Sequence, residues 1–398
     1  MMMNKPVNKI EKLIEEFCPQ GVEFRALGEV IKSLKTGLNP RKNFILNTDD
    51  AKNYYVTVRE LGGIRIDFLD KTDKVNDEAL GLINNRSNLE AGDILFSGTG
   101  TVGRTALIVE NPKNWNIKEG VYTIKPDKNS IHSKFLLYYL NSIHAVGQYE
   151  KKIVGSPVIS LPMKEFKKIL IPIPPLTIQK EIVKILDNFT RLEAELEAEL
   201  EARKKQYMYY REELLSFGDD VEFRTLGEVY KFKYGKGNTI PTVGGQYPVY
   251  GSNGVVGTHN EFNSENSPVI GHIGAYAGIV NWGHGKHYVT YNGVICKIIV
   301  DFVTPKYAYY QLLKQDFNSM AHSASQPFVS YDMLNKVLIP IPSLSKQKEI
   351  VAILDKFDVL VNDISAGLPA EIAARKKQYE YYRNQLLTFE PLEAQDAN

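Results

Sequence analysis

The sequence predicts an α+β protein in which two similar α/β domains alternate with two long helices. Three observations support this prediction: the chain contains a long internal repeat, the repeated parts carry a helical pattern of apolar residues, and the intervening parts carry short strand-like runs separated by glycine. With 398 residues, the chain is long enough for two to four domains with cores of their own. The repeat predicts that the two copies are related by a pseudo-twofold axis.

The internal repeat consists of three pairs of stretches. The first pair shares eight of nine residues, and each of the other pairs shares twelve of sixteen. A period this long excludes a solenoid and indicates two copies of one module, a globular domain followed by a helix. The paired stretches are 22–30 with 221–229, 171–186 with 339–354, and 202–217 with 374–389. We therefore expect an N-terminal helix (1–21), a first domain (22–175), a first long helix (176–220), a second domain (221–343), a second long helix (344–390) and a flexible tail (391–398).

Both long helices carry apolar residues spaced four and three apart, which is the seam of a coiled coil. We expect the two helices to pair with each other; the alternative is that each packs on its own domain. In the second helix the seam shifts by four residues after Ile364, and Pro369 predicts a kink or a restart. The seam positions are Ile178, Ile182, Ile185, Phe189, Leu192, Leu196, Tyr207, Tyr210, Leu214 and Phe217, then Ile350, Ile353, Phe357, Leu360, Ile364, Leu368, Ile372, Arg375, Tyr379, Tyr382, Leu386 and Phe389.

The strand-like runs of the two domains are short and rich in β-branched or aromatic residues. They lie at 56–58, 64–66, 93–96, 120–125, 247–250, 269–270 and 293–299. Two short helices are expected at matching places, 135–140 in the first domain and 307–313 in the second.

Composition and charge restrict the class of protein. No apolar run reaches the ~18 residues of a membrane span, and residues 1–17 lack the apolar core of a signal peptide. Only Cys18 and Cys296 are present, so we expect a cytoplasmic protein without a disulfide framework. The net charge is +1, but Lys and Arg exceed Asp and Glu by five in 22–175 and by two in 221–343. The positive excess therefore lies in the two predicted domains.

Two motifs of catalytic sites occur at one place and are both incomplete. Residues 96–100 resemble the cofactor loop of S-adenosylmethionine-dependent methyltransferases, and residues 98–105 resemble a phosphate-binding loop, with Arg104 in place of its lysine. A strand-like run follows where either motif requires a helix. His259, His272, His284 and His287 cluster in the sequence, but no spacing indicates a metal site. We expect no cofactor, no metal and no catalytic residue.

Glycine-rich turns recur in the two domains and are the candidate DNA contacts. Residues 98–103 have a counterpart at 271–278, and residues 250–257 form a further polar glycine loop. Such turns let the backbone approach a base edge or a phosphate, although a plain hairpin turn explains them equally well. The candidate residues are Ser97, Thr99, Thr101 and Arg104 in the first domain and Ser252, Asn253, His272 and Tyr276 in the second.

The ends of both long helices repeat a group of tyrosines and an arginine. Tyr207 and Tyr210 belong to the seam, whereas Tyr209 points elsewhere. Aromatic and arginine side chains are common anchors of protein interfaces. Tyr209, Arg211, Tyr381 and Arg383 are therefore candidate contacts to partner proteins; the alternative is that they only close the coiled coil.

The repeated stretches resemble the type I restriction–modification DNA specificity subunits (S subunits), and the resemblance covers the whole chain. It implies two target recognition domains, held apart by antiparallel helices, that each read one half of a bipartite, asymmetric DNA site. It also implies docking of two methyltransferase subunits, with methylation, ATP hydrolysis and cleavage left to methyltransferase and translocating restriction subunits. Family members often have arginine where His272 stands. The pieces that carry the resemblance are Phe17–Phe24, Ile171–Pro175, Gln179–Val183 and Ala374–Arg383.

Two other functions stay open from the residues alone. One is an enzyme, either a stand-alone DNA methyltransferase or a restriction–modification fusion, and the incomplete catalytic motifs disfavour it. The other is a coiled-coil scaffold with two protein-binding domains and no DNA role. Methyl transfer by the purified chain would support the first, and binding to duplex DNA with its partner methyltransferase would exclude the second.

Overall fold

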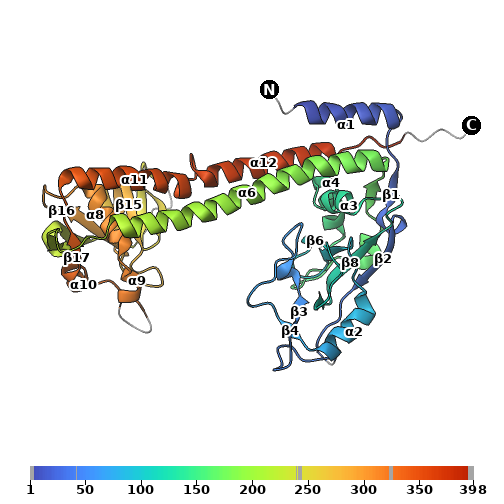
Figure 1. Cartoon of the computed structure of the whole chain (residues 1–398), viewed down its shortest axis with the longest axis horizontal. Helices are drawn as coiled ribbons and strands as arrows, with labels where there is room; N and C mark the ends of the chain where they lie inside the picture. The colour runs from blue at the N-terminus through green and yellow to red at the C-terminus, as the bar shows by residue number, and fades with distance from the viewer. Residues whose placement is uncertain (1–3, 42, 239, 241–243, 322–325, 393–398) are drawn as a thin grey trace, which may run out of the picture. The chain divides into compact units, whose positions relative to one another are not determined.

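A computed structural model describes residues 4–41, 43–238, 240, 244–321 and 326–392 (Figure 1). The chain divides into two compact units. Unit 1 consists of Met1–Glu195 and Ala373–Asn398, and unit 2 consists of Leu196–Ile372. Helix α6 (Leu176–Leu214) begins in unit 1 and ends in unit 2, and α12 (Leu368–Leu386) begins in unit 2 and ends in unit 1. The predicted α+β class with two similar domains is confirmed.

Unit 1 begins with a helix and then forms three small sheets with short helices between them. The sheet orders are β1-β9, β2-β8-β5-β6 and β4-β3-β7. Its elements are α1 (Asn4–Phe17), β1 (Phe24–Ala26), β2 (Ile31–Thr36), β3 (Asn53–Val56), β4 (Lys74–Val75), α2 (Asp77–Ser87), β5 (Ile94–Ser97), β6 (Thr105–Leu107), β7 (Trp115–Ile117), β8 (Val121–Pro126), α3 (Ser133–Leu140), α4 (Ile143–Tyr149), α5 (Met163–Phe166) and β9 (Leu170–Pro172).

Unit 2 forms a two-stranded sheet, β10-β17, and a six-stranded sheet of order β11-β16-β14-β15-β12-β13. Its elements are β10 (Phe223–Thr225), α7 (Leu226–Val229), β11 (Tyr230–Tyr234), β12 (Tyr247–Gly251), β13 (Gly254–His259), β14 (Ser264–Gly271), β15 (Val280–Val289), β16 (Gly293–Ile298), α8 (Pro305–Lys314), α9 (Phe317–Met320), α10 (Tyr331–Lys336), β17 (Leu338–Pro340) and α11 (Leu344–Asn362).

The internal repeat extends into the parts of the chain whose sequences differ. The order β2-β8-β5-β6 in unit 1 equals the order β11-β16-β14-β15 in unit 2, with antiparallel pairing throughout. A glycine follows β2 in unit 1 and β11 in unit 2, because a side chain there would clash with the backbone. A Cβ on Gly37 would lie 1.9 Å from the Ile117 carbonyl oxygen, and a Cβ on Gly235 would lie 2.1 Å from the Thr290 carbonyl oxygen. The units differ beyond this shared sheet: unit 1 adds β3, β4, β7 and α2, and unit 2 adds β12 and β13.

A buried glutamine anchors the domain to the first turns of the long helix in each unit. In unit 2 the Gln347 amide donates to the carbonyl oxygens of Phe302 (3.0 Å) and Pro342 (2.9 Å) and accepts from the Thr304 N–H (2.8 Å). In unit 1 the Gln179 amide makes the same three kinds of bond, to Ser130, Pro174 and His132. Both glutamines are fully buried, so the repeated sequence corresponds to a repeated polar anchor.

A second repeated contact links the short helix of each domain to the long helix. The Tyr138 hydroxyl on α3 donates to the Asp187 carboxylate (2.6 Å), which also pairs with Lys134 (2.7 Å). The Tyr310 hydroxyl on α8 likewise donates to the Asp355 carboxylate (2.5 Å). The two predicted short helices are therefore confirmed, and each is fixed to its long helix by the same tyrosine–aspartate pair.

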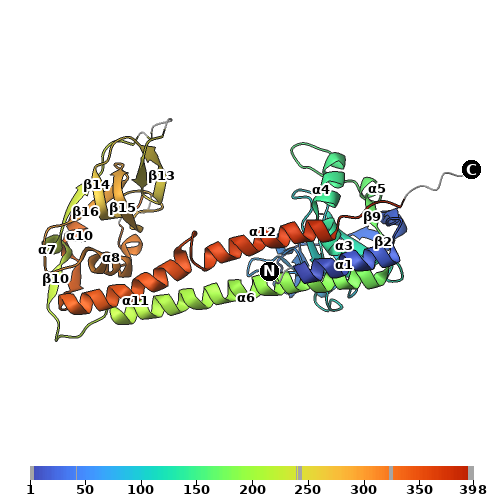
Figure 2. The same cartoon turned by 90° about the horizontal axis from the view of Figure 1, so that it is seen from above.

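The long helices pack both on each other and on their own domains. In unit 1 the Phe189 ring stacks on Tyr382 at 5.5 Å, while Glu193, further along α6, pairs with Lys376, earlier in α12 (3.3 Å). This reversed order shows that α6 and α12 are antiparallel where they lie side by side in unit 1 (Figure 1 and Figure 2). Ile178 and Ile182 of α6 are buried in the core of the domain. Both predicted alternatives therefore occur in α6. Its first turns pack on the domain, and a later part packs on the other long helix.

The second long helix is interrupted, as Pro369 predicts. Helix α11 ends at Asn362 and α12 begins at Leu368. The Asp363 side chain accepts from the backbone N–H groups of Ser365 (2.6 Å) and Ala366 (3.1 Å), which stabilises the turn between the two helices. Ile364, a predicted seam residue, is 86% exposed, so its seam assignment is wrong and the break takes up the four-residue shift.

The C-terminal segment closes unit 1 around its N-terminal residues. The Val22 N–H donates to the Glu390 carbonyl oxygen (2.8 Å), and the Leu392 N–H donates to the Val22 carbonyl oxygen (2.9 Å). A Cβ on Gly21 would lie 2.5 Å from the Pro391 carbonyl oxygen, so glycine permits this approach. The first two residues of the expected flexible tail, Pro391 and Leu392, thus lie alongside Val22 as an extended segment, and residues 393–398 lie outside the described residues.

Candidate nucleic-acid interface

The glycine turns of the two domains occupy equivalent places in the shared sheet. Turn 1 (residues 98–104) joins β5 to β6, and turn 2 (residues 272–279) joins β14 to β15. Gly100 N–H donates to the Ile159 carbonyl oxygen in unit 1, and Gly274 N–H donates to the Pro327 carbonyl oxygen in unit 2, both at 2.9 Å. The predicted correspondence of the turns is confirmed, and each turn is tied to a loop that leads back to the long helix.

One position shows how the same backbone accommodates different side chains. Leu161 N–H donates to the Gly98 carbonyl oxygen, and Val329 N–H donates to that of His272, so Gly98 and His272 are equivalent. A Cβ on Gly98 would lie 2.1 Å from the Tyr122 ring, whose hydroxyl donates to the Leu161 carbonyl oxygen (2.6 Å). His272 fills this space in unit 2, with Nδ1 3.0 Å from the Val329 carbonyl oxygen and 6% exposure. His272 is therefore placed to hold the backbone of turn 2 and not to contact DNA.

The two candidate serines also serve the turns internally. Ser97 is fully buried, and its hydroxyl donates to the Thr101 carbonyl oxygen (2.5 Å) and accepts from the Arg104 N–H (2.8 Å). The Ser252 hydroxyl is half-buried and donates to the Asn292 carbonyl oxygen (2.9 Å). Both hydroxyls therefore brace the backbone, and neither is placed to contact a base.

Five of the predicted residues present their side chains to solvent. Thr99, Thr101 and Arg104 are exposed in turn 1, and Asn253 and Tyr276 are exposed in unit 2. Tyr276 is 51% exposed at the tip of turn 2. Among the described residues Arg104 has no ion-pair partner, and its guanidinium makes one long contact, 3.5 Å from Nη1 to the Val58 carbonyl oxygen. These residues form the exposed part of the candidate interface.

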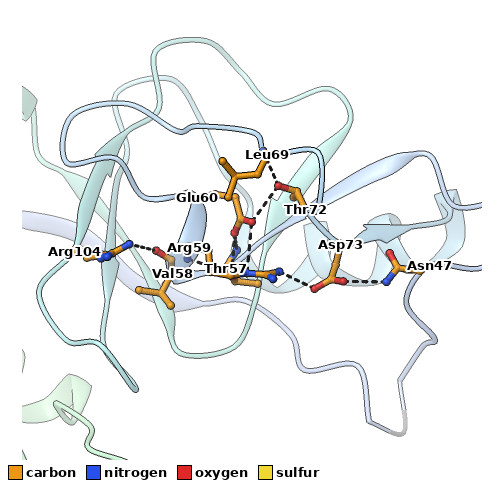
Figure 3. Close-up of polar contacts among 9 residues, drawn as sticks. All are labelled: Asn47, Thr57, Val58, Arg59, Glu60, Leu69, Thr72, Asp73 and Arg104. Carbon is orange, nitrogen blue, oxygen red and sulfur yellow. Dashed lines mark hydrogen bonds and ion pairs between the residues drawn. The ribbon is translucent and has the colours of Figure 1, made fainter. Parts of the chain in front are cut away.

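A second arginine lies next to turn 1 and was missed from the sequence. Arg59 follows Val58 in the chain, and its guanidinium is held by Thr57 Oγ1 (3.3 Å) and by the Asp73 carboxylate (3.0 Å) (Figure 3). It lies in the part of unit 1 that has no counterpart in unit 2 within the described ranges. The sequence does contain a signal for this place: Thr57 and Glu60 have the spacing of a capping box, and the structure shows that capping box.

Unit 2 carries an aromatic cluster around turn 2 that was also missed. The Tyr234 ring stacks on Tyr331 (4.1 Å) and contacts the His272 ring (4.2 Å). Tyr291 and Phe328 border this cluster and are 45% and 41% exposed. The exposed side chains near turn 2 are therefore mainly aromatic, whereas those near turn 1 are arginine and threonine.

The repeated residues on the long helices separate into inner and outer positions. Arg211 lies over the Tyr207 ring (5.6 Å), and Arg383 lies over the Tyr379 ring (5.4 Å). Tyr209 and Tyr381 are instead 62% and 63% exposed. A hydrogen bond to the Glu213 carboxylate raises the pKa of Tyr209 above its usual value. The tyrosines predicted to point away from the seam are thus exposed in both copies.

The predicted histidine cluster does not form a metal site. His259 stacks on the Tyr288 ring (4.3 Å), and His287 is buried, which lowers its pKa. Within the described ranges no three His, Cys, Asp or Glu side chains come close enough to hold a metal ion. Likewise, no described helix is long and apolar enough to cross a membrane.

Comparison with solved structures supports the fold. An S subunit of a type I restriction–modification system from M. genitalium has a TM-score of 0.58, with 92% of this chain and 96% of that chain covered at 18% identity. A chain from a structure of type I restriction–modification complex assembly has a TM-score of 0.59, with 93% and 98% covered at 18% identity. The likeness therefore extends over both units.

Comparison of sequences shows the family. The model of the type I restriction modification DNA specificity domain matches residues 19–202 and 218–374. The specificity subunit of the Escherichia coli type I restriction enzyme EcoprrI is 33% identical over 369 residues, which cover 86% of this chain and 89% of that protein. The corresponding EcoR124I/EcoR124II subunit of Escherichia coli is 34% identical over 300 residues, covering 66% and 72%. The chain therefore belongs to the family of type I restriction–modification DNA specificity subunits.

Proposed function

We propose that this subunit reads a bipartite, asymmetric duplex DNA site, with unit 1 contacting one half and unit 2 the other. One observation carries the proposal: the two units repeat one scaffold but expose different side chains at equivalent turns. Turn 1 exposes Thr99, Thr101 and Arg104, whereas turn 2 exposes Tyr276. Unit 2 also exposes Asn253, between β12 and β13. A shared scaffold with different exposed chemistry is what two domains need in order to recognise two different short sequences.

The exposed side chains suit recognition of base edges. Arginine pairs with guanine, asparagine with adenine, and threonine with either a hydrogen-bonding edge or a thymine methyl group. The excess of Lys and Arg in 22–175 and 221–343 favours the phosphate backbone of the same duplex. The modest size of this excess indicates that partner subunits supply part of the phosphate contact.

The exposed tyrosines of the long helices are the proposed contacts to two methyltransferase subunits. Tyr209 and Tyr381 occupy equivalent places in the repeat, so each of two copies of one partner can contact the same kind of exposed tyrosine. Arg211 and Arg383 lie over inner tyrosines and are only partly exposed. Aromatic side chains anchor interfaces because they bury a large area at a small entropic cost.

The chain itself is proposed to be non-catalytic and to act in the cytoplasm. Adenine methylation then belongs to the methyltransferase subunits, and ATP hydrolysis, translocation and cleavage belong to the restriction subunits of the complete complex. Purified chain, free of partner subunits, is expected to show none of these activities. Methyl transfer from labelled S-adenosylmethionine by the chain alone would contradict this part of the proposal.

The direct test is selection of random duplexes by the chain assembled with methyltransferase subunits. Sequencing of the retained DNA should reveal two short defined sequences separated by a spacer of fixed length. Enrichment of one contiguous sequence would contradict the bipartite reading. Retention of DNA without enrichment of any sequence, or no retention at all, would contradict a role in specificity and favour a scaffold.

A further inference from the structure

Arg59 is fixed in direction before any ligand binds. Its Nη2 lies 3.0 Å from Asp73 Oδ2, and its Nε donates to Thr57 Oγ1 at 3.3 Å. Asp73 is itself held, because Asn47 donates to its other carboxylate oxygen at 2.9 Å (Figure 3). The Arg59 side chain is nevertheless 42% exposed. The guanidinium is thus held along one edge while part of it faces solvent.

A buried carboxylate sets the backbone that carries Arg59. Glu60 is fully buried, and one of its oxygens accepts from both the N–H (2.8 Å) and the hydroxyl (2.7 Å) of Thr57. Its other oxygen accepts from the Thr72 hydroxyl (3.0 Å). Glu60 therefore ties together the two ends of the 58–72 segment. A residue buried this deeply with all these bonds acts by positioning its neighbour and not by touching DNA.

Arg59 and Arg104 differ in the charges around them, and this difference suits them to different contacts with DNA. The positive charge of Arg59 is offset by Asp73 and by the Glu60 carboxylate, 3.8 Å from Nε, so it adds little to the general attraction for phosphate. Its planar donor groups keep a fixed direction, which suits the paired acceptors of a guanine edge. Arg104 lies beside the same segment, 3.5 Å from the Val58 carbonyl oxygen, and its charge is not offset by an ion pair among the described residues. Arg104 therefore suits a phosphate as well as a base.

We infer that Arg59 reads a guanine in the half-site recognised by unit 1, with Asp73 and Glu60 as its positioning residues. This inference rests on the proposed function and deepens it, because it names a base and a residue that determines specificity. Since the described residues of unit 2 include no counterpart of the segment that carries Arg59, the inference also gives a physical reason for the two half-sites to differ.

The test is duplex selection, with affinity measured at several salt concentrations, by the chain assembled with methyltransferase subunits. Arg59→Ala should remove the preference for one G·C pair in one half-site and weaken binding to the full site by about 5- to 150-fold. Arg59→Lys keeps the charge but loses the planar fork, so we expect it to lose the same preference. Asp73→Asn should weaken that preference while binding to unrelated DNA does not fall. Arg25→Ala is the matched control, because Arg25 is equally exposed (42%) and also pairs with a carboxylate, that of Glu23.

Three outcomes would overturn the inference while leaving the proposed function intact. One is an unchanged half-site in Arg59→Ala. Another is a loss that is equal for all sequences, restored by Arg59→Lys, and accompanied by a shallower salt dependence, which identifies a phosphate contact. The third is an Arg59→Lys protein that keeps the full guanine preference, which decides the matter even if Arg59→Ala fails to fold. Failure of the unaltered complex to enrich any bipartite sequence would instead overturn the proposed function itself.

Discussion

Replacing Gln347 with leucine should destabilise unit 2 and leave unit 1 unchanged. The substitution keeps the size of the side chain but removes three hydrogen bonds, to Phe302, Pro342 and Thr304. Each bond contributes about 0.5–1.5 kcal/mol, and a donor left without a partner adds to the loss. Burial of the leucine offsets part of it, so we expect the free energy of unfolding of unit 2 to fall by about 2–4 kcal/mol.

The two tryptophans of the chain allow each unit to be followed separately. Trp115 lies in unit 1 and Trp282 lies in unit 2, so in a Trp115→Phe background fluorescence reports on unit 2 alone. A loss of about 3 kcal/mol lowers the melting temperature of a domain of about 150–250 residues by about 6–12 °C.

A matched control and the repeated anchor complete the test. Gln315→Leu is the control, because the Gln315 amide makes one long bond of 3.4 Å. Gln179→Leu should have the same effect on unit 1, read from Trp115 in a Trp282→Phe background. A loss in Gln347→Leu no larger than that of the control would refute the argument that the repeated glutamine anchors each domain to its helix.

Three further predictions concern the long helices and the response to pH. Replacing Tyr209 and Tyr381 with serine should weaken assembly with methyltransferase subunits, measured by light scattering, without lowering the melting temperature; unaltered assembly would favour a purely structural role. One extra Leu-Glu-Ala-Glu unit within 192–203 adds about 6 Å of helix, so we expect unchanged half-sites and a spacer about one base pair longer in methylation-site mapping; a changed half-site would contradict this. Burial lowers the pKa of His287, so the stability it contributes is present above about pH 6.5 and lost as the pH falls; between pH 7.5 and 5.5 the melting temperature should fall more in the unaltered protein than in His287→Gln, and equal slopes would contradict the assignment.

The repeated parts of the chain were predictable because their pattern is local. The spacing of Ile178, Ile182 and Phe189 predicts a helix whatever surrounds it, and Pro369 predicts the interruption of the second helix. Several strands lie outside the predicted runs, and β11 was missed despite a clear signal. In β11 the residues Tyr230 and Phe232 alternate with lysines, a pattern typical of a half-buried strand. The sequence of β15 contains glycine and polar residues and lacks a strand pattern. This strand is identified only by its pairing with β14 in the structure.

The candidate interface was less predictable because it depends on contacts between distant segments. The exposure of Thr99, Thr101 and Tyr276 follows from their place at turn tips. The burial of His272 does not, because it depends on whether a neighbouring strand supplies a large ring such as Tyr122 in unit 1. Arg59 acquires its place only when Glu60 and Asp73 close the 58–72 segment. Sequence position alone says nothing of that closure.

The central claim is that each unit reads its own half of the DNA site. The most direct measurement is methylation-site mapping for three complexes that contain the unaltered chain, Arg104→Ala in unit 1, or Tyr276→Ala in unit 2. The account predicts that the two substitutions relax or weaken recognition at opposite halves of one bipartite site, and that each leaves the other half and the spacer unchanged. Relaxation of the same half by both substitutions, or equal weakening of both halves by either one, would contradict it.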